Sequence, residues 1–172
     1  MSLPFLGRST IQRFVVRFFV IFGLVELFTY TFPPLAYQEW LATVVGNTLN
    51  ISVNGTLLTA NGIVFEITPF CTGLSTWGLL LGLIYGFDAL STRKKIIYSL
   101  VGWGIIFGVN ILRLLAIVYV GKTYHFEAVD TLHTFTWFVM SGLVMGGWLF
   151  ILQRELKTTN LHSIAQSLLR EH

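Results

Sequence analysis

Four stretches of the chain are apolar for about as long as a helix needs to cross the hydrocarbon core of a membrane, which takes about 20 residues. They cover residues 14–32, 72–90, 96–121 and 134–153. A segment in lipid must satisfy its own backbone hydrogen bonds, so these stretches are expected to be helices. Pro33-Pro34 should end the first of them. The pattern predicts one all-α membrane domain, residues 1–172, built as a bundle of about four transmembrane helices.

The segment between the first two stretches, residues 33–71, has a pattern of its own. Apolar residues at helical spacing predict an amphipathic helix over 35–49 that lies in the membrane interface. Three short β-branched runs follow, separated by Asn54-Gly55 and Asn61-Gly62. Asn-Gly pairs are typical of hairpin turns, because both residues tolerate positive φ. A small β-hairpin insertion of three strands is therefore expected to lead into the second span.

The basic residues give the orientation. With four spans, nine of the eleven Lys and Arg residues fall on one side, namely Arg8, Arg13, Arg17, Arg93, Lys94, Lys95, Arg154, Lys157 and Arg170. Excess Lys and Arg mark the cytoplasmic side. The sequence thus predicts a multi-pass protein of the cell membrane with both termini in the cytoplasm. Segments 33–71 and 122–133 should be extracytoplasmic, and the tail 154–172 should be a cytoplasmic helix on the membrane surface.

Composition agrees with a membrane protein and narrows its chemistry. Hydrophobic residues make up 54% of the chain and charged residues 11%, and the mean hydropathy is +0.72. The net charge of +3 comes from residues that flank the spans, so it indicates no nucleic-acid partner. The single cysteine excludes an internal disulfide. We expect no cofactor.

That single cysteine, Cys71, is the first candidate for chemistry. Pro69 favours the start of a helix, so the amides of Thr72, Gly73 and Leu74 should point toward the thiol. A helix N-terminus favours the thiolate, which is the nucleophilic form of cysteine. The alternative is a packing role, because a membrane cysteine often acts as a small buried hydrophobic residue.

Arg113 is the second candidate, because an ionisable side chain inside a span is costly and usually functional. It lies about 12 Å below the outer end of the third span, and Glu26 lies about 9 Å below that of the first. Asn110 stands one turn before Arg113 on the same face. A Glu26–Arg113 pair would lower the cost of burying both charges. Arg113 could instead extend to the outer surface.

His133 is the third candidate, at the expected start of the fourth span. An imidazole can act as general acid or base near neutral pH, and Asp130 is close enough in sequence to orient the ring. His125 is a rival in the same loop. A zinc site would need three or four protein ligands, and Cys71 and His133 have too few obvious companions, so no metal is expected.

Together these residues resemble motifs of the archaeosortase/exosortase family of integral membrane sorting enzymes. Cys71-Thr72-Gly73-Leu74 is similar to the family's cysteine motif, and this form of it favours an archaeosortase. Asn110-Ile111-Leu112-Arg113 is similar to its Asn-x-x-Arg motif, and His133 to its histidine. The resemblance covers residues 24–152, in a short form with four spans.

The resemblance implies a cysteine endopeptidase and transpeptidase. Its partners would be exported proteins that end in a short motif, a transmembrane helix and a basic cluster. Cys71 would form a thioester with the substrate, His133 would exchange protons, and Arg113 would stabilise the developing negative charge. The protein would then be transferred to an acceptor, with a lipid anchor as the expected one. A hydrolase with the same site, and a non-enzymatic assembly factor or transporter subunit, are the alternatives.

Overall fold

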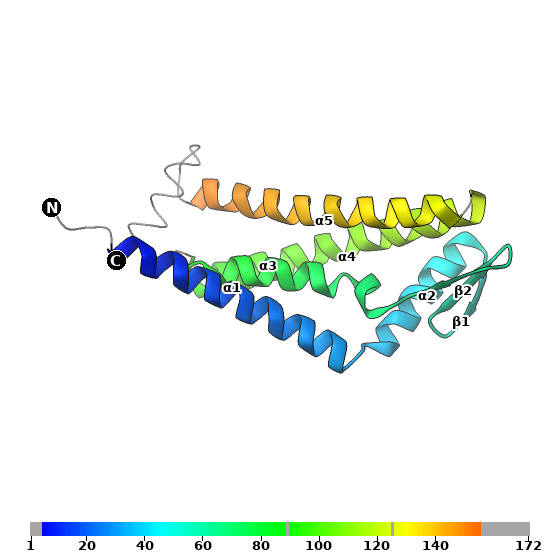
Figure 1. Ribbon diagram of the computed structural model, residues 1–172, viewed down its shortest axis with the longest axis horizontal. Helices are drawn as coiled ribbons and strands as arrows, with labels where there is room; N and C mark the ends of the chain where they lie inside the picture. The colour runs from blue at the N-terminus through cyan, green and yellow to red at the C-terminus, as the bar shows by residue number, and fades with distance from the viewer. Residues whose placement is uncertain (1–4, 89, 125, 156–172) are drawn as a thin grey trace.

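The computed structural model describes residues 5–88, 90–124 and 126–155. Its elements in chain order are α1 (Phe5–Thr31), α2 (Leu35–Leu49), β1 (Ser52–Asn54), β2 (Leu57–Ala60), β3 (Ile63–Glu66), the 3₁₀ helix η1 (Pro69–Thr72), α3 (Leu74–Gly86), α4 (Thr92–Thr123) and α5 (Phe126–Glu155). The helices α1, α3, α4 and α5 run lengthwise through the molecule (Figure 1), and α2 and the sheet lie together at one end of it. The start of α1 and the end of α5 lie at the opposite end.

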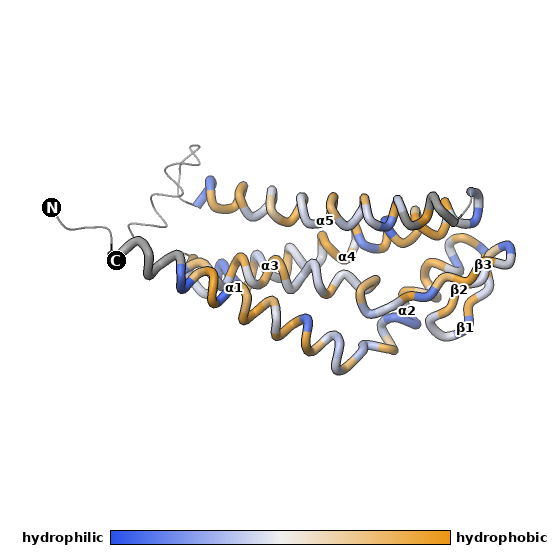
Figure 2. The backbone as a smooth tube through the Cα atoms, in the orientation of Figure 1, coloured by the Kyte–Doolittle hydropathy of each residue, from blue (hydrophilic) through white to orange (hydrophobic). Residues whose placement is uncertain are grey.

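The expected class, an all-α membrane protein with a small β insertion, is confirmed. Within the described residues, three helices are long and apolar enough to cross a membrane, over Gln12–Thr31, Thr92–Thr123 and Thr131–Glu155. Hydrophobic residues recur along these helices (Figure 2), and many large ones are exposed on the helix surfaces, as lipid-facing residues are. The chain is a multi-pass membrane protein.

The second stretch differs from the prediction of one continuous span over 72–90. Its helix α3 has 13 residues, which corresponds to about 20 Å against the roughly 30 Å of a hydrocarbon core. Gly73 adopts φ +80 before the helix, and Phe87 is extended after it. These two conformations interrupt the helical hydrogen bonding at both ends.

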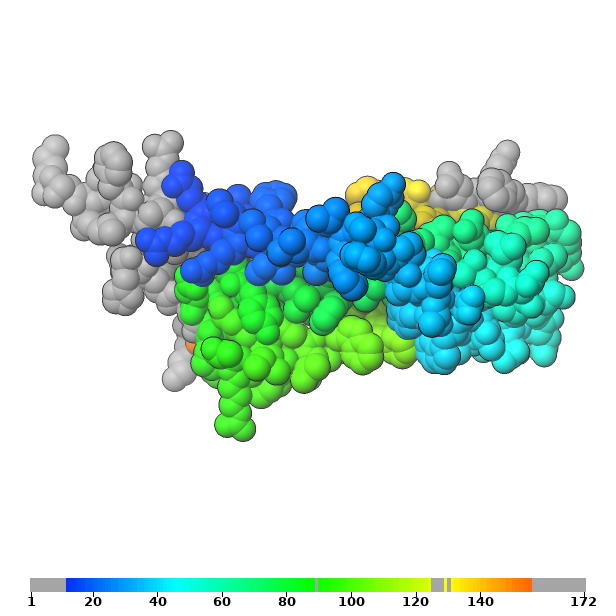
Figure 3. Space-filling view, turned by 90° about the horizontal axis from the view of Figure 1, so that it is seen from below, coloured from blue at the N-terminus to red at the C-terminus, as the bar shows by residue number. Residues whose placement is uncertain are grey.

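Glycines on α3 form the surface on which α1 packs. A Cβ at Gly78 would lie 2.8 Å from Val25, one at Gly82 would lie 2.8 Å from Phe18, and one at Gly86 would lie 3.0 Å from Phe14. Small residues at every fourth position let two helices approach closely in a membrane, where packing replaces the hydrophobic effect as the attraction. The pairs also show that α1 and α3 run antiparallel, and Figure 3 shows α1 lying along the bundle.

Ion pairs join the helices at the end of the molecule where α1 begins and α5 ends. Arg17 pairs with Asp88, and Lys94 pairs with Glu155, which also accepts a hydrogen bond from Tyr98 Oη at 2.6 Å. A core of buried residues from α3, α4 and α5 lies next to them, including Leu83, Ile84 and Leu152. These contacts connect α1 to the segment after α3, and α4 to α5.

The opposite end is a cap formed by α2 and a three-stranded antiparallel meander in the order β1-β2-β3. Helix α2 has the predicted bounds. Its buried face consists of Gln38, Leu41, Ala42, Val45 and Gly46, and Trp40 on another face is 45% exposed. Asn61 and Gly62 both have positive φ, as predicted for the second turn. The first two-residue loop is Gly55-Thr56, because Asn54 already pairs with Leu57.

The predicted outer loop 122–133 is mostly helical. Helix α4 continues to Thr123 and α5 begins at Phe126, so only a short link joins them. His125 and the predicted surface helix of the tail, residues 156–172, lie outside the described residues.

The glycine surface of α3 leads to a stability prediction. Gly82→Leu should destabilise the protein by roughly 1–3 kcal/mol, because the new side chain would meet both the ring and the backbone oxygen of Phe18. Gly104→Leu is the matched control, since nothing lies within 4 Å of a Cβ built there. Thermal unfolding in detergent measures both variants. Equal melting temperatures would contradict the packing described for α1 and α3.

Candidate active site

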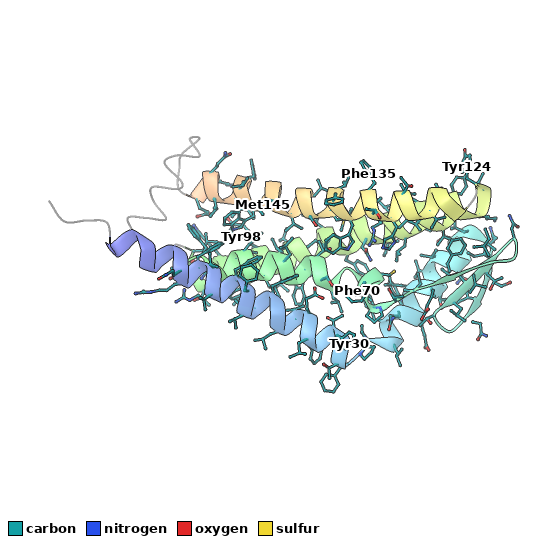
Figure 4. All side chains as sticks on the ribbon, viewed as in Figure 1. Tyr30, Phe70, Tyr98, Tyr124, Phe135 and Met145 are labelled. Atoms are coloured by element: carbon teal, nitrogen blue, oxygen red, sulfur yellow. The ribbon has the colours of Figure 1, made fainter. Side chains whose placement is uncertain are left out.

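Cys71 lies in the short turn η1, between the meander and α3. Its amide donates to Thr68 O at 2.9 Å, its side chain is 7% exposed, and its Sγ lies 3.4 Å from Thr68 Oγ1. The prediction that Cys71 occupies the first turn of the second span is wrong. Gly73 takes a left-handed conformation that separates η1 from α3, and α3 begins only at Leu74. Figure 4 labels the neighbouring Phe70, between the start of α3 and the meander.

Gly73 also allows the turn to touch α4. A Cβ on Gly73 would lie 3.2 Å from Asn110 Cγ, so a larger residue would collide with that side chain as well as strain the backbone. Asn110 is fully buried, and its Nδ2 donates to Cys71 O at 2.8 Å. The backbone of the cysteine turn is thus held directly on α4.

Arg113 extends this contact from α4 to α5. Its Nη1 donates to Asn110 Oδ1 at 3.3 Å, its Nε to Thr136 Oγ1 at 3.1 Å, and its Nη2 to His133 Nε2 at 3.4 Å. Three guanidinium nitrogens therefore hold three different side chains. Arg113 is only 7% exposed. The snorkelling alternative is wrong, because the group ends inside the protein.

The hydrogen bond from Arg113 fixes the tautomer of the neutral His133 ring. A guanidinium can only donate, so Nε2 of His133 accepts and the proton of the neutral ring is on Nδ1. Thr136 lies one turn further along α5 and donates from Oγ1 to His133 O at 3.0 Å. His133 lies in the second turn of α5 and near the start of the candidate membrane span Thr131–Glu155, close to where it was expected. The side chain of Asp130, expected to orient the ring, lies outside the described part of the structure.

Glu26 does not pair with Arg113, contrary to the prediction. The two ion pairs among the described side chains are the Arg17–Asp88 and Lys94–Glu155 pairs at the other end of the bundle. Helix α1 packs chiefly against α3, whereas Arg113 lies on α4 and faces α5. Similar depth in two spans did not bring the two charges together, because their helices are not neighbours.

Two residues of α2 in the cap cover the cysteine turn, and the sequence analysis did not include them in the site. Tyr37 Oη donates to Thr72 O at 3.3 Å, and burial raises the pKa of this phenol, which keeps the donor proton in place. Gln38 Nε2 donates to Ile67 O at 2.7 Å, and Thr72 Oγ1 to Pro69 O at 2.5 Å. Thr68 and Thr136 were also missed. Thr136 had a signal, since it stands three residues after His133 on a helix.

The arrangement suits nucleophilic chemistry on a carbonyl group. It combines a thiol, a fixed cation that can stabilise developing negative charge, and an imidazole that can move protons. Within the residues that the structure describes, no three His, Cys, Asp or Glu side chains are grouped closely enough to hold a metal ion.

Comparison with known proteins identifies the family of the chain. The chain is 24% identical over 145 residues to a probable archaeosortase D from Methanocaldococcus jannaschii, and the match covers 84% of this chain and 91% of that protein. No solved structure matches the chain. The model of the transmembrane exosortase family matches residues 1–152. The chain therefore belongs to the transmembrane exosortase family.

Proposed function

We propose that this protein is a membrane cysteine transpeptidase that cuts a C-terminal sorting signal from exported proteins. The substrate would carry a short motif, a transmembrane helix and a basic cluster, and its new carboxyl end would pass to an acceptor, a lipid anchor. One observation carries the proposal. A continuous hydrogen-bonded path joins the turn of Cys71 to Asn110, then to Arg113, and then to His133.

Each residue has one role in this mechanism. The thiolate of Cys71 attacks the scissile carbonyl carbon, and the guanidinium of Arg113 stabilises the resulting oxyanion. The C–N bond then breaks while His133, which has taken the thiol proton at Nε2 after releasing its bond from Arg113, gives that proton to the leaving amine, which leaves a thioester on Cys71. The acceptor nucleophile loses its proton to His133 and attacks the thioester, which releases the thiolate. Asn110 and Gly73 position the cysteine turn throughout.

The orientation supports the same role. Arg13, Arg17, the Arg93–Lys95 segment and Arg154 gather where α1 begins and α5 ends, so the cysteine turn and the cap would face the extracytoplasmic side. An exported substrate that is anchored by one helix would present its cleavage motif there. Single cysteines introduced at Asn54 and Thr92 in a Cys71→Ala chain should react with impermeant maleimide from outside and inside, respectively. The reverse pattern would contradict this orientation.

Cys71 tests the proposed function directly. Cys71→Ala and Cys71→Ser should each lower processing at least about a thousandfold, because removing a covalent nucleophile removes most of the chemical acceleration. The assay follows an exported reporter that ends in a transmembrane helix and a basic cluster. Size-exclusion chromatography in detergent should show that both variants stay folded. Normal processing by the alanine variant would eliminate the cysteine mechanism.

Arg113 should require a planar group with three separate donors. Arg113→Lys keeps the charge but offers one nitrogen in place of three, so it should lower kcat about a hundredfold or more. Arg154→Lys, an exposed residue at the opposite end, is the matched control and should process normally. A lysine variant with full activity would show that any positive charge is sufficient at this position.

His133 can be assigned to one step of the reaction. If it protonates the leaving amine, His133→Ala should stop before the thioester, and little Cys71-linked substrate should accumulate. A thioester that forms and persists, visible by mass spectrometry, would place His133 only in the second step. His125→Ala should have a mild effect. A severe loss in that variant with a normal His133→Ala would transfer the role to His125.

A further inference from the structure

A cavity lies beside the candidate site, within the helical bundle. It has a volume of about 260 Å³ and is bounded by Phe22 of α1, Ser75 and Leu79 of α3, and Trp137 and Ser141 of α5. Its walls are mostly apolar, with hydroxyl groups at the serines. Met145, labelled on α5 in Figure 4, bounds it further from the site.

The cavity begins where the candidate site ends. Ser75 follows Cys71 by four residues, and Trp137 follows His133 by four, which is about one helical turn on α5. The other lining residues of α3 and α5 lie further along these helices, toward the end that carries the ion pairs. A chain held at Cys71 and continuing into the membrane would enter this space directly.

Two buried oxygen atoms beside the cavity lack partners. Ser75 is 6% exposed, and its Oγ has no hydrogen-bond partner among the described residues. The same holds for Oε1 of Glu26 within that part of the chain. Glu26 follows Phe22 by one turn on α1, and the Val25–Gly78 contact places it level with the first turn of α3. Ser75 thus lies at the end of the cavity nearest to Cys71, and Glu26 lies at the same level on α1, one turn beyond the cavity-lining Phe22.

We propose that this cavity binds the substrate residues just after the scissile bond, where the exported protein enters its own transmembrane helix. The inference rests on the proposed function and names the subsite of that reaction. The first four N–H groups of any helix have no partner within the helix, and in a membrane nothing but protein can satisfy them. Ser75 Oγ and Glu26 Oε1 are acceptors of the required kind. A lipid chain would have no donor for them.

Filling the cavity should weaken binding of the helix-bearing reporter. Ser141→Trp should raise KM about tenfold or more and change kcat little, because the new ring occupies the space that the substrate needs. Leu143→Trp adds the same ring to the same helix at a side chain that is 57% exposed, and it should leave KM unchanged. Equal KM values for the two folded variants would overturn the proposal.

Substitutions at the two acceptors, Ser75 and Glu26, should weaken substrate binding without the loss of stability that a packing role would predict. Ser75→Ala removes a buried hydroxyl without a partner, so the melting temperature should stay the same or rise while KM increases several-fold. Glu26→Gln should raise KM in the same direction, since an amide keeps only one acceptor oxygen. A photoreactive benzoylphenylalanine at Leu79 in the Cys71→Ala chain should crosslink to the first turn of the reporter's helix. Crosslinks to lipid alone, or an unchanged KM in both variants, would contradict the proposal.

These outcomes separate the subsite from the reaction. If Cys71→Ala abolishes processing while Ser141→Trp, Ser75→Ala and Glu26→Gln behave as the wild-type chain does, the subsite is wrong and the transpeptidase stands. If Cys71→Ala processes the reporter normally, the proposed function fails first, whatever the cavity variants do.

Discussion

A guanidinium buried between membrane helices constrains the half of this protein that contains the cysteine turn. Arg113 has no acidic partner among the described residues, and its charge is instead distributed over neutral acceptors on α4 and α5. Leaving one of these bonds unmade in a medium of low dielectric constant would cost several kcal/mol. The spacing of α4 and α5 and the rotamers of Asn110 and His133 are therefore fixed together. Because Asn110 also holds the carbonyl of Cys71, the same constraint reaches the cysteine turn.

The cysteine turn itself depends on a change of backbone conformation at Gly73. A helix that continued from α3 through residue 72 would use its own backbone groups for internal hydrogen bonds. The left-handed residue instead frees the carbonyl groups of Cys71 and Thr72, which accept from Asn110 on one side and Tyr37 on the other. The turn is thus attached to α4 and to α2 at adjacent residues. The polar side chains that could act on a substrate lie next to it.

Sequence patterns predicted what depends on composition and local chemistry. The apolar stretches, the bounds of α2 and the Asn61-Gly62 turn all follow from residue type and period. The Glu26–Arg113 pair failed because hydropathy gives the depth of a residue but not its neighbours around the bundle. The glycines at 78, 82 and 86 held that missing information, since they show where α1 packs. The prediction of an unbroken helix over 72–90 was wrong because hydropathy does not report backbone conformation. It could not show the left-handed residue Gly73 before α3 or the extended residue Phe87 after it.

The short helix α3 has a consequence for where the reaction would occur. Its inner end is tied to α1 through the Arg17–Asp88 pair, and its length of about 20 Å sets how far from that anchor the cysteine turn can lie. With the orientation proposed above, this length is about 10 Å less than the thickness of the hydrocarbon core. The difference is a hydrophobic mismatch between α3 and the bilayer. In the proposed orientation this mismatch would place the thiol below the headgroups, within reach of substrates that are already inserted in the bilayer.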